Sequence, residues 1–200
     1  MTTPPTALSP LARLHETVRR TAELTRDRIP TGRAAEAADE TDGTFATDGA
    51  LGFDPFPFLR TLHAAGSRAV LVGQVAGILH GSAEPTGDLD LLWDGSPEEA
   101  RALHEALSAA DCTELPDLTR PQAAYRVSGV TGDLCTPALP WGGLDTTGCL
   151  TRALTATDPA DGLTVRYAAL DDLIRMRRAI GRPKDHRRAD ELERLRTALG

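Results

Sequence analysis

The spacing of apolar positions changes along the chain and predicts two unlike parts. Residues 9–29 read as an amphipathic helix, with Ser9 as N-cap and Pro10 in the first helical position. Its thin apolar stripe consists of Leu11, Leu14, Val18 and Leu24. Residues 31–50 are polar, acidic and rich in Gly and Thr, which is typical of a flexible linker. We therefore predict that residues 1–50 are an N-terminal extension that the fold does not need.

From residue 51 onward, short apolar runs alternate with helical patterns. Helices are predicted over 54–66, 74–81, 96–111, 169–181 and 183–200. Strands are predicted over 68–73, 88–93, 123–129, 132–137 and 163–167. The helices and strands do not alternate strictly, and the chain ends in two helices. Residues 51–200 are thus expected to form one α/β (α+β) domain, a small mixed sheet flanked by helices.

Bulk composition narrows the function classes. The net charge of −7 over 200 residues argues against a nonspecific nucleic-acid binder. Three scattered cysteines without metal-ligand spacing fit reduced thiols. The first ten residues lack the basic and apolar regions of a signal peptide, and the longest uncharged apolar-rich run, residues 69–79, is too short to span a bilayer. We expect a cytoplasmic protein without membrane contact.

Two aspartates two residues apart interrupt an otherwise apolar strand. Because side chains alternate along a strand, Asp88 and Asp90 should share one face while Leu89 points into the core. Two carboxylates on one face can bind a hard dication such as Mg²⁺, which prefers oxygen ligands. The plainer interpretation is a strand end exposed to solvent.

Two further residues favour the chemical interpretation. Gly73 follows a predicted strand and opens a helix, so its backbone can approach a phosphate group. Asp133 supplies a third carboxylate on another predicted strand.

This order of motifs resembles the polymerase-β-like nucleotidyltransferase superfamily, and most closely its small bacterial AbiEii-like and minimal nucleotidyltransferase branch. The signature reads Val72-Gly73-Gln74, then thirteen intervening residues, then Asp88-Leu89-Asp90. The stretches "HG…PTGDLDLL" and "LDDLIRMRRAIGRPKD" are also similar to these proteins. The resemblance covers roughly residues 55–199.

The resemblance implies a Mg²⁺-dependent enzyme that transfers NMP from an NTP to a hydroxyl group. It implies that two metal ions are held by Asp88, Asp90 and Asp133, and that Asp133 helps deprotonate the acceptor. The residues implied to contact the nucleotide are Gly73, Gln74, Thr86 and Lys184. The acceptor is left open between tRNA, a partner protein and a small molecule, and a cognate antitoxin-type protein is a further candidate partner.

Two departures from the family pattern favour an alternative. Gln74 stands where the signature usually has a small residue, and Glu84 stands before Pro85 where such proteins commonly have a basic residue. The bulk of Gln74 or the negative charge of Glu84 would disfavour binding of a triphosphate. The alternative is a catalytically degenerate member of the fold that serves as a binding or regulatory module.

The C-terminal part contains a strongly basic segment. Residues 175–188 carry seven Arg or Lys residues against one Asp. This segment is either an electropositive rim for a triphosphate or nucleic acid, or a solvated helix face paired with nearby acidic residues. Trp93 and Trp141 are predicted to serve in packing rather than in stacking against a base.

Overall fold

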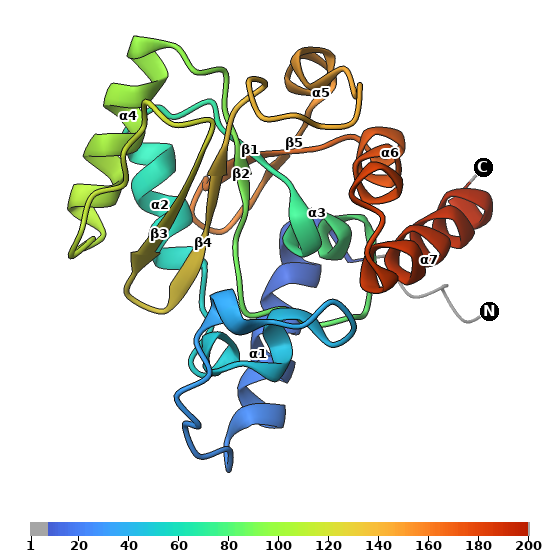
Figure 1. Cartoon of the computed structure of the whole chain (residues 1–200). Coiled ribbons are helices and arrows are strands. Elements are labelled where there is room, and N and C mark those ends of the chain that lie inside the picture. Colours follow the sequence, from blue (N-terminus) through green and yellow to red (C-terminus); the bar gives the residue numbers. More distant parts are fainter. Residues whose placement is uncertain (1–7, 200) are drawn as a thin grey trace.

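A mixed β-sheet with helices on both sides forms the centre of the molecule (Figure 1). The structure is a computed structural model and describes residues 8–199. Within this range the six strands are β1 Val70–Leu71, β2 Leu91–Leu92, β3 Gln122–Val127, β4 Val130–Cys135, β5 Leu154–Thr157 and β6 Thr164–Tyr167. Their order is β3-β4-β2-β1-β6-β5. Strand β1 runs parallel to β6 and antiparallel to β2, and β2 runs parallel to β4, so the predicted mixed sheet is confirmed.

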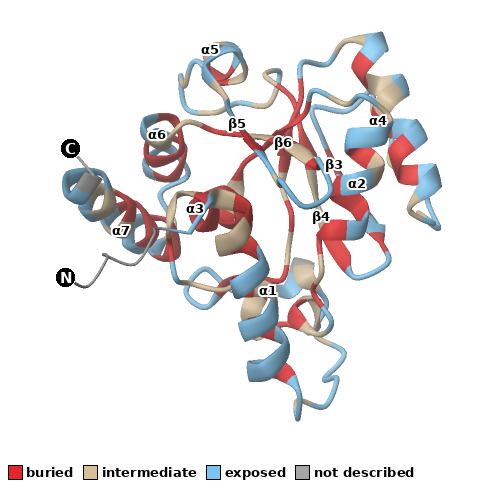
Figure 2. Ribbon diagram, turned by 180° about the vertical axis from the view of Figure 1, so that it is seen from behind, coloured by how far each residue is buried: buried red, intermediate tan, exposed pale blue. Residues whose placement is uncertain are grey.

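Helices cover the two faces of the sheet. The α-helices within residues 8–199 are α1 Pro10–Thr25, α2 Phe56–Ala64, α3 Gly73–His80, α4 Pro97–Ala109, α5 Thr146–Arg152, α6 Leu170–Ile180 and α7 Pro183–Leu199. In Figure 1, α2 and α4 lie on the left of the sheet, and α3, α6 and α7 lie on the right. Seen from behind, the central strands, α3 and the inner sides of α2 and α6 are mostly buried, whereas the outer sides of α1 and α7 are exposed (Figure 2).

Most of the predicted elements are present, and the differences have local causes. The sequence gives no strong signal for α5 and β5, which we did not predict. Strand β5 lies at the edge of the sheet, is rich in threonine and buries only Ala156, so it lacks an apolar alternation. The turn between β3 and β4 is also shorter than predicted, because Val130 already belongs to β4 and pairs with Val127.

The N-terminal part packs against the rest of the fold more extensively than its sequence indicates. Helix α1 begins after Ser9, whose hydroxyl accepts a hydrogen bond from the backbone N–H of Ala12, as predicted. Leu11 and Leu14 are fully buried, whereas Leu24 is 51% exposed and does not belong to the buried stripe. Three threonines continue that stripe, namely Thr17, Thr21 and Thr25.

The segment predicted to be a flexible linker is packed against the domain. Residues 31–50 contain three short 3-10 turns, η1 Ala35–Ala37, η2 Gly43–Ala46 and η3 Asp48–Ala50. Thr44, Thr47 and Ala50 are buried. A Cβ on Gly87 would lie 2.6 Å from the backbone nitrogen of Ala50, which shows how closely the two backbones approach. The sequence missed this packing because the buried residues are small and polar.

None of the helices within residues 8–199 is long and apolar enough to cross a membrane.

Candidate functional site

A cavity of about 340 Å³ lies beside the sheet, between the ends of β1 and β4 and the helices α3, α6 and α7. Its lining divides by chemistry into three sides. The carboxylate side consists of Asp88, Asp90 and Asp133. The cationic side consists of Arg177, Arg182, Lys184 and Arg188. The third side is apolar and is formed by the loop after β4 together with α6.

The predicted alternation of side chains sets the carboxylate side. Asp88 and Asp90 lie in the extended stretch that leads into β2, and both line the cavity. Leu89 between them is fully buried, and its backbone N–H donates to the carbonyl of Thr131, 2.9 Å away. Asp133 lies on the neighbouring strand β4 and reaches the same cavity. The structure therefore brings the three predicted carboxylates to one cavity.

Glycine at position 73 is required by the carboxylate next to it. Gly73 has a φ of +62°, a conformation that favours glycine. A Cβ at this position would collide with Oδ2 of Asp90. Gly73 thus lets the start of α3 approach Asp90 directly, and it lines the cavity. Its contact with a phosphate stays a prediction.

Asp90 is the most perturbed of the three carboxylates. Burial, together with the charges of Asp88 and Asp133, raises the pKa of Asp90 to about 8. The backbone N–H of Asp133 donates to Oδ1 of Asp90 at 3.3 Å and opposes this shift only in part. Negative charge is therefore crowded at this side of the cavity, which a dication would relieve.

Two threonine hydroxyls hold Asp88. Thr86 Oγ1 donates to Asp88 Oδ1 at 2.5 Å, and Thr44 Oγ1 donates to the same oxygen at 3.0 Å. Thr86 is fully buried and is not part of the cavity lining, so it supports Asp88 rather than facing the nucleotide as we predicted. Thr44, which the sequence analysis assigned to the linker, lines the cavity.

The carboxylates suit a hard dication in donor type. The carboxylate oxygens of Asp88 and Asp90 are ligands of the kind that Mg²⁺ prefers. Within residues 8–199, however, no group of three or more His, Cys, Asp or Glu side chains already stands at ligand spacing. The convergence of the three carboxylates on a metal pair stays a prediction. Asp88 and Asp90 would hold such an ion most directly, since they flank Leu89 on one face of the chain.

The cationic side is built on the junction of α6 and α7. Arg177, Lys184 and Arg188 are each less than 10% exposed although they line the cavity. Arg177 Nη1 donates to Asp185 Oδ1 at 3.0 Å, and Asp185 is fully buried. Burial and the charges of Arg182 and Arg188 lower the pKa of Lys184. An anion in the cavity would compensate this concentration of positive charge.

Gln74 is part of the scaffold of this cationic side. Its Nε2 donates to Ser82 Oγ at 3.0 Å and to the carbonyl of Glu84 at 2.9 Å. Its Oε1 accepts from Arg177 Nη2 at 3.0 Å. The amide group therefore orients Arg177, and its hydrogen bonds are directed into the protein rather than toward the centre of the cavity.

Glu84 does not line the cavity. Arg188 Nε donates to Glu84 Oε1 at 2.8 Å, and Arg187 Nη2 donates to the same oxygen at 3.1 Å. Although burial opposes ionisation, these arginines hold the pKa of Glu84 below its ordinary value. The negative charge of Glu84 is thus neutralised by basic residues of α7, so the two sequence departures do not obstruct the cavity.

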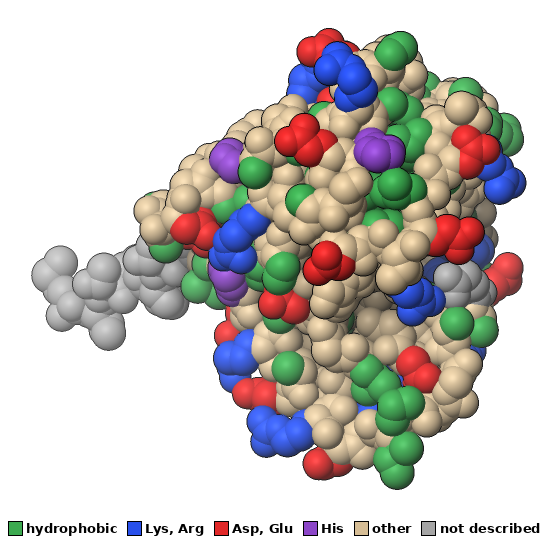
Figure 3. All heavy atoms as spheres, turned by 90° about the vertical axis from the view of Figure 1, so that its left-hand side faces the viewer, with side chains coloured by type: hydrophobic (Ala, Val, Ile, Leu, Met, Phe, Trp, Pro, Cys, Tyr) green, Lys and Arg blue, Asp and Glu red, His purple; other side chains and the backbone are tan. Residues whose placement is uncertain are grey.

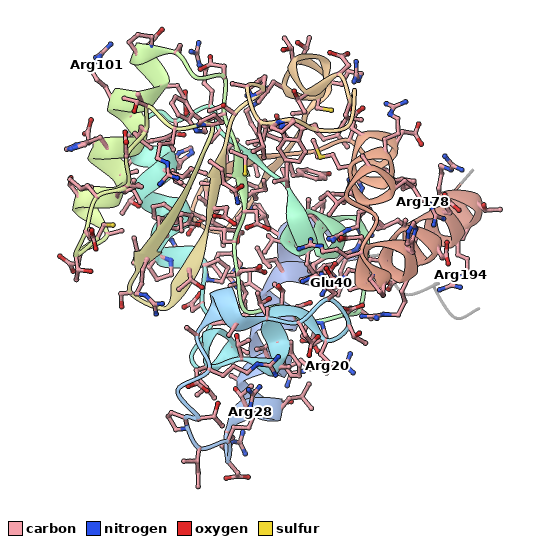
Figure 4. All side chains as sticks on the ribbon, in the orientation of Figure 1. Arg20, Arg28, Glu40, Arg101, Arg178 and Arg194 are labelled. Carbon is pink, nitrogen blue, oxygen red and sulfur yellow. The ribbon has the colours of Figure 1, made fainter. Side chains whose placement is uncertain are left out.

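Much of the basic segment is paired with acidic residues outside the cavity. The ion pairs are Arg175–Asp172, Arg178–Asp190, Arg182–Asp185, Arg187–Glu84 and Arg188–Glu84. Figure 4 shows Arg178 and Arg194 on the outer side of α6 and α7. On a different face, over α4 and the β3–β4 hairpin, acidic and basic side chains are interspersed (Figure 3). The segment therefore divides into two parts. Arg175, Arg178 and Arg187 are paired outside the cavity, whereas the other four basic residues line it, namely Arg177, Arg182, Lys184 and Arg188.

The N-terminal segment closes one edge of the site. The carbonyl of Glu40 in this segment accepts a hydrogen bond of 2.9 Å from the backbone N–H of Lys184 at the start of α7, and Figure 4 labels Glu40 near that helix. Arg28 Nη1 donates to the carbonyl of Phe45 at 2.7 Å and holds the far end of the segment. The sequence analysis did not identify Thr44 as a site residue, because only the tertiary fold brings it next to Asp88.

Removing the Thr44 hydroxyl tests how the segment is attached. In Thr44→Val, Asp88 Oδ1 would lose a donor and the buried N–H of Gly87 would lose its acceptor, which lies 3.2 Å away. We expect a loss of about 1–3 kcal/mol in the free energy of unfolding, measured with urea. Thr44→Ser keeps the hydroxyl and is expected to stay within about 1 kcal/mol of the wild type. Equal stability of the Val and Ser variants would contradict this role.

A scan against models of known protein families gave no match to this chain, and a search of curated proteins gave none.

Proposed function

We propose that this protein is a Mg²⁺-dependent nucleotidyltransferase that transfers NMP from an NTP to a hydroxyl group. The observation that carries the proposal is a single cavity with three chemically different sides. Carboxylates suit a dication, buried cations suit a triphosphate, and an apolar wall suits a base. Each side corresponds to one part of a magnesium–nucleotide complex.

The reaction assigns a role to each side. Asp88 and Asp90 hold the dication, which supplies neutralisation of the phosphate charge when bound. Asp133 accepts the proton of the acceptor hydroxyl. The acceptor oxygen forms a bond to the α-phosphorus, the bond from that phosphorus to the bridging oxygen breaks, and pyrophosphate leaves. Lys184 and Arg177 stabilise the charge of the departing phosphates.

The acceptor remains open between tRNA, protein and small molecule. Outside the cavity, Arg175, Arg178 and Arg187 are paired with acidic side chains, which weakens the case for tRNA, because few cations of the segment outside the cavity are left to neutralise its phosphates. A protein or small-molecule hydroxyl is therefore the acceptor we favour.

Nucleotide binding is the first test. At about 100 times its dissociation constant, an NTP with Mg²⁺ should stabilise the native state by roughly 2.7 kcal/mol, or about 5–10 °C in melting temperature. Asp88→Asn should abolish the shift seen with Mg²⁺ and NTP. If none of the four NTPs raises the melting temperature in the presence of Mg²⁺, the proposal is wrong.

The degenerate binding module is the second candidate function. It is favoured by the hydrogen bonds from Thr44 and Thr86 that engage Oδ1 of Asp88. Incubation with a cell lysate and NTP labelled at the α-phosphate separates the two. Transfer of α-label to an acceptor, with no transfer of γ-label, supports the enzyme. Binding without transfer supports the module.

A further inference from the structure

The third side of the cavity is apolar, and its residues come from two elements. The loop after β4 and the helix α6 supply Leu139, Pro140, Trp141, Leu173, Met176 and Ile180. The loop packs against α6, since a Cβ on Gly142 would lie 3.8 Å from the Cβ of Ala179. The wall therefore has a defined backbone on both sides.

Trp141 is held by its one polar atom. The indole Nε1 donates to the carbonyl of Thr136 at 3.1 Å. The backbone of the loop is fixed by a second bond to the same residue, from the N–H of Leu139 to the carbonyl of Thr136 at 3.1 Å. With Nε1 engaged, Trp141 can offer the cavity only carbon surface. Trp141 packs against the hydrophobic core, as predicted, and it also lines the cavity.

The wall continues directly into the charged sides of the same cavity. Met176 and Arg177 are neighbours on α6 and both line it. A ligand that fills the cavity must therefore combine a flat apolar end with a polyanionic end. On the basis of the proposed function, we propose that Trp141 and the apolar wall receive the base of the NTP and bind all four bases with little selectivity.

Weak selectivity follows from the polar groups around the wall. Reading a base requires hydrogen-bonding groups in fixed positions. Of the uncharged polar side chains in the lining, Thr44 is bonded to Asp88 and Gln74 to Arg177. The third, Gln122, is exposed at the start of β3, and its amide can serve as donor or acceptor. Stacking on Trp141 then dominates, and it favours the larger purine rings over pyrimidines.

Binding measurements with four NTPs and with inorganic tripolyphosphate, all with Mg²⁺, test the inference. We expect the four NTP affinities to lie within about tenfold of each other, with purines tighter. Trp141→Ala should weaken every NTP about tenfold or more, and Trp141→Phe should retain most of the affinity. Neither variant should change the affinity for tripolyphosphate, which has no base.

A second variant guards against a folding defect. Ile180→Ser changes a side chain that is 46% exposed on the same wall, and it should weaken NTP but not tripolyphosphate binding about threefold. Unchanged NTP affinity in Trp141→Ala, or a preference for one base above about a hundredfold, would overturn the base site while leaving the proposed function intact. Failure of both NTP and tripolyphosphate to bind would overturn the proposed function itself.

Discussion

Asp90→Asn is expected to lower nucleotidyl transfer about a thousandfold or more, while the metal-free protein becomes more stable than the wild type at pH 8. The loss in rate corresponds to about 4 kcal/mol of transition-state stabilisation and follows from the loss of a carboxylate that, in the proposed function, would hold the dication. The gain in stability follows from relief of repulsion among Asp88, Asp90 and Asp133, which contributes to the raised pKa of Asp90.

The stability effect should depend on pH with a known sign. The pKa of Asp90 is about 8 in the folded protein against an ordinary value of 3.8, so between these values the folded state binds more protons than the unfolded state. The contribution of Asp90 to the free energy of unfolding therefore falls as pH rises from about 4 to 8. Asparagine does not titrate, so the advantage of Asp90→Asn should be small near pH 4 and largest near pH 8.

Urea unfolding at pH 5 and pH 8, without metal, measures this difference. Asp94→Asn is the matched control, because Asp94 lies outside the cavity lining, with 41% of its side chain exposed. This control variant should show no gain in the free energy of unfolding at pH 8 and no loss of nucleotidyl-transfer activity. If Asp90→Asn instead destabilises the metal-free fold by more than about 2 kcal/mol at pH 8, Asp90 has a structural role and the degenerate module becomes the better interpretation.

The carboxylate side could be predicted because its cause is local. Side chains alternate along an extended backbone, so Asp88 and Asp90 share one face and Leu89 lies in the core, although residues 88–90 precede β2 and are not part of a strand as predicted. Asp133 could be predicted because it lies on a recognisable strand. The basic residues near Lys184 could also be recognised in the sequence. The sequence pattern does not distinguish those that line the cavity from those that form ion pairs on the surface. Arg177 and Arg178 are adjacent in sequence, and only the packing of α6 sends the first to the cavity and the second to Asp190.

The rest of the site depends on tertiary contacts that leave little trace in the sequence. Thr44 and Asp88 are far apart in the chain, and the residues around Thr44 carry no apolar pattern. In α1, Thr17 and Thr25 are buried, and each donates its hydroxyl to the carbonyl four residues earlier. This bond satisfies the hydroxyl inside the helix, so threonine occupies positions where a periodicity analysis looks for leucine. A buried helix face therefore appears thin in the sequence.

Deletion of residues 1–50 is expected to prevent folding, against the sequence-based prediction that this part is dispensable. The deletion removes Leu11 and Leu14 from the core, and it removes Arg13, whose Nη1 donates to the carbonyl of Leu79 at 2.9 Å at the end of α3. It also removes Thr44 from Asp88. Truncating one buried leucine costs about 2–5 kcal/mol, so losing both approaches the 5–15 kcal/mol that stabilises a typical domain.

Point variants of α1 test whether the loss of its buried side chains, rather than truncation of the chain in general, prevents folding. Leu14→Ala should lower the free energy of unfolding by about 2–5 kcal/mol, because Leu14 is fully buried. Arg20→Ala is the matched control on the exposed side of the same helix, where Figure 4 shows Arg20, and it should change stability by less than about 0.5 kcal/mol. If a fragment of residues 51–200 instead folds with the melting temperature of the full chain, the contacts of α1 and Thr44 contribute little and the N-terminal part is dispensable after all. The buried leucines make that outcome the less expected one, since their removal would expose the side of α3 that α1 covers.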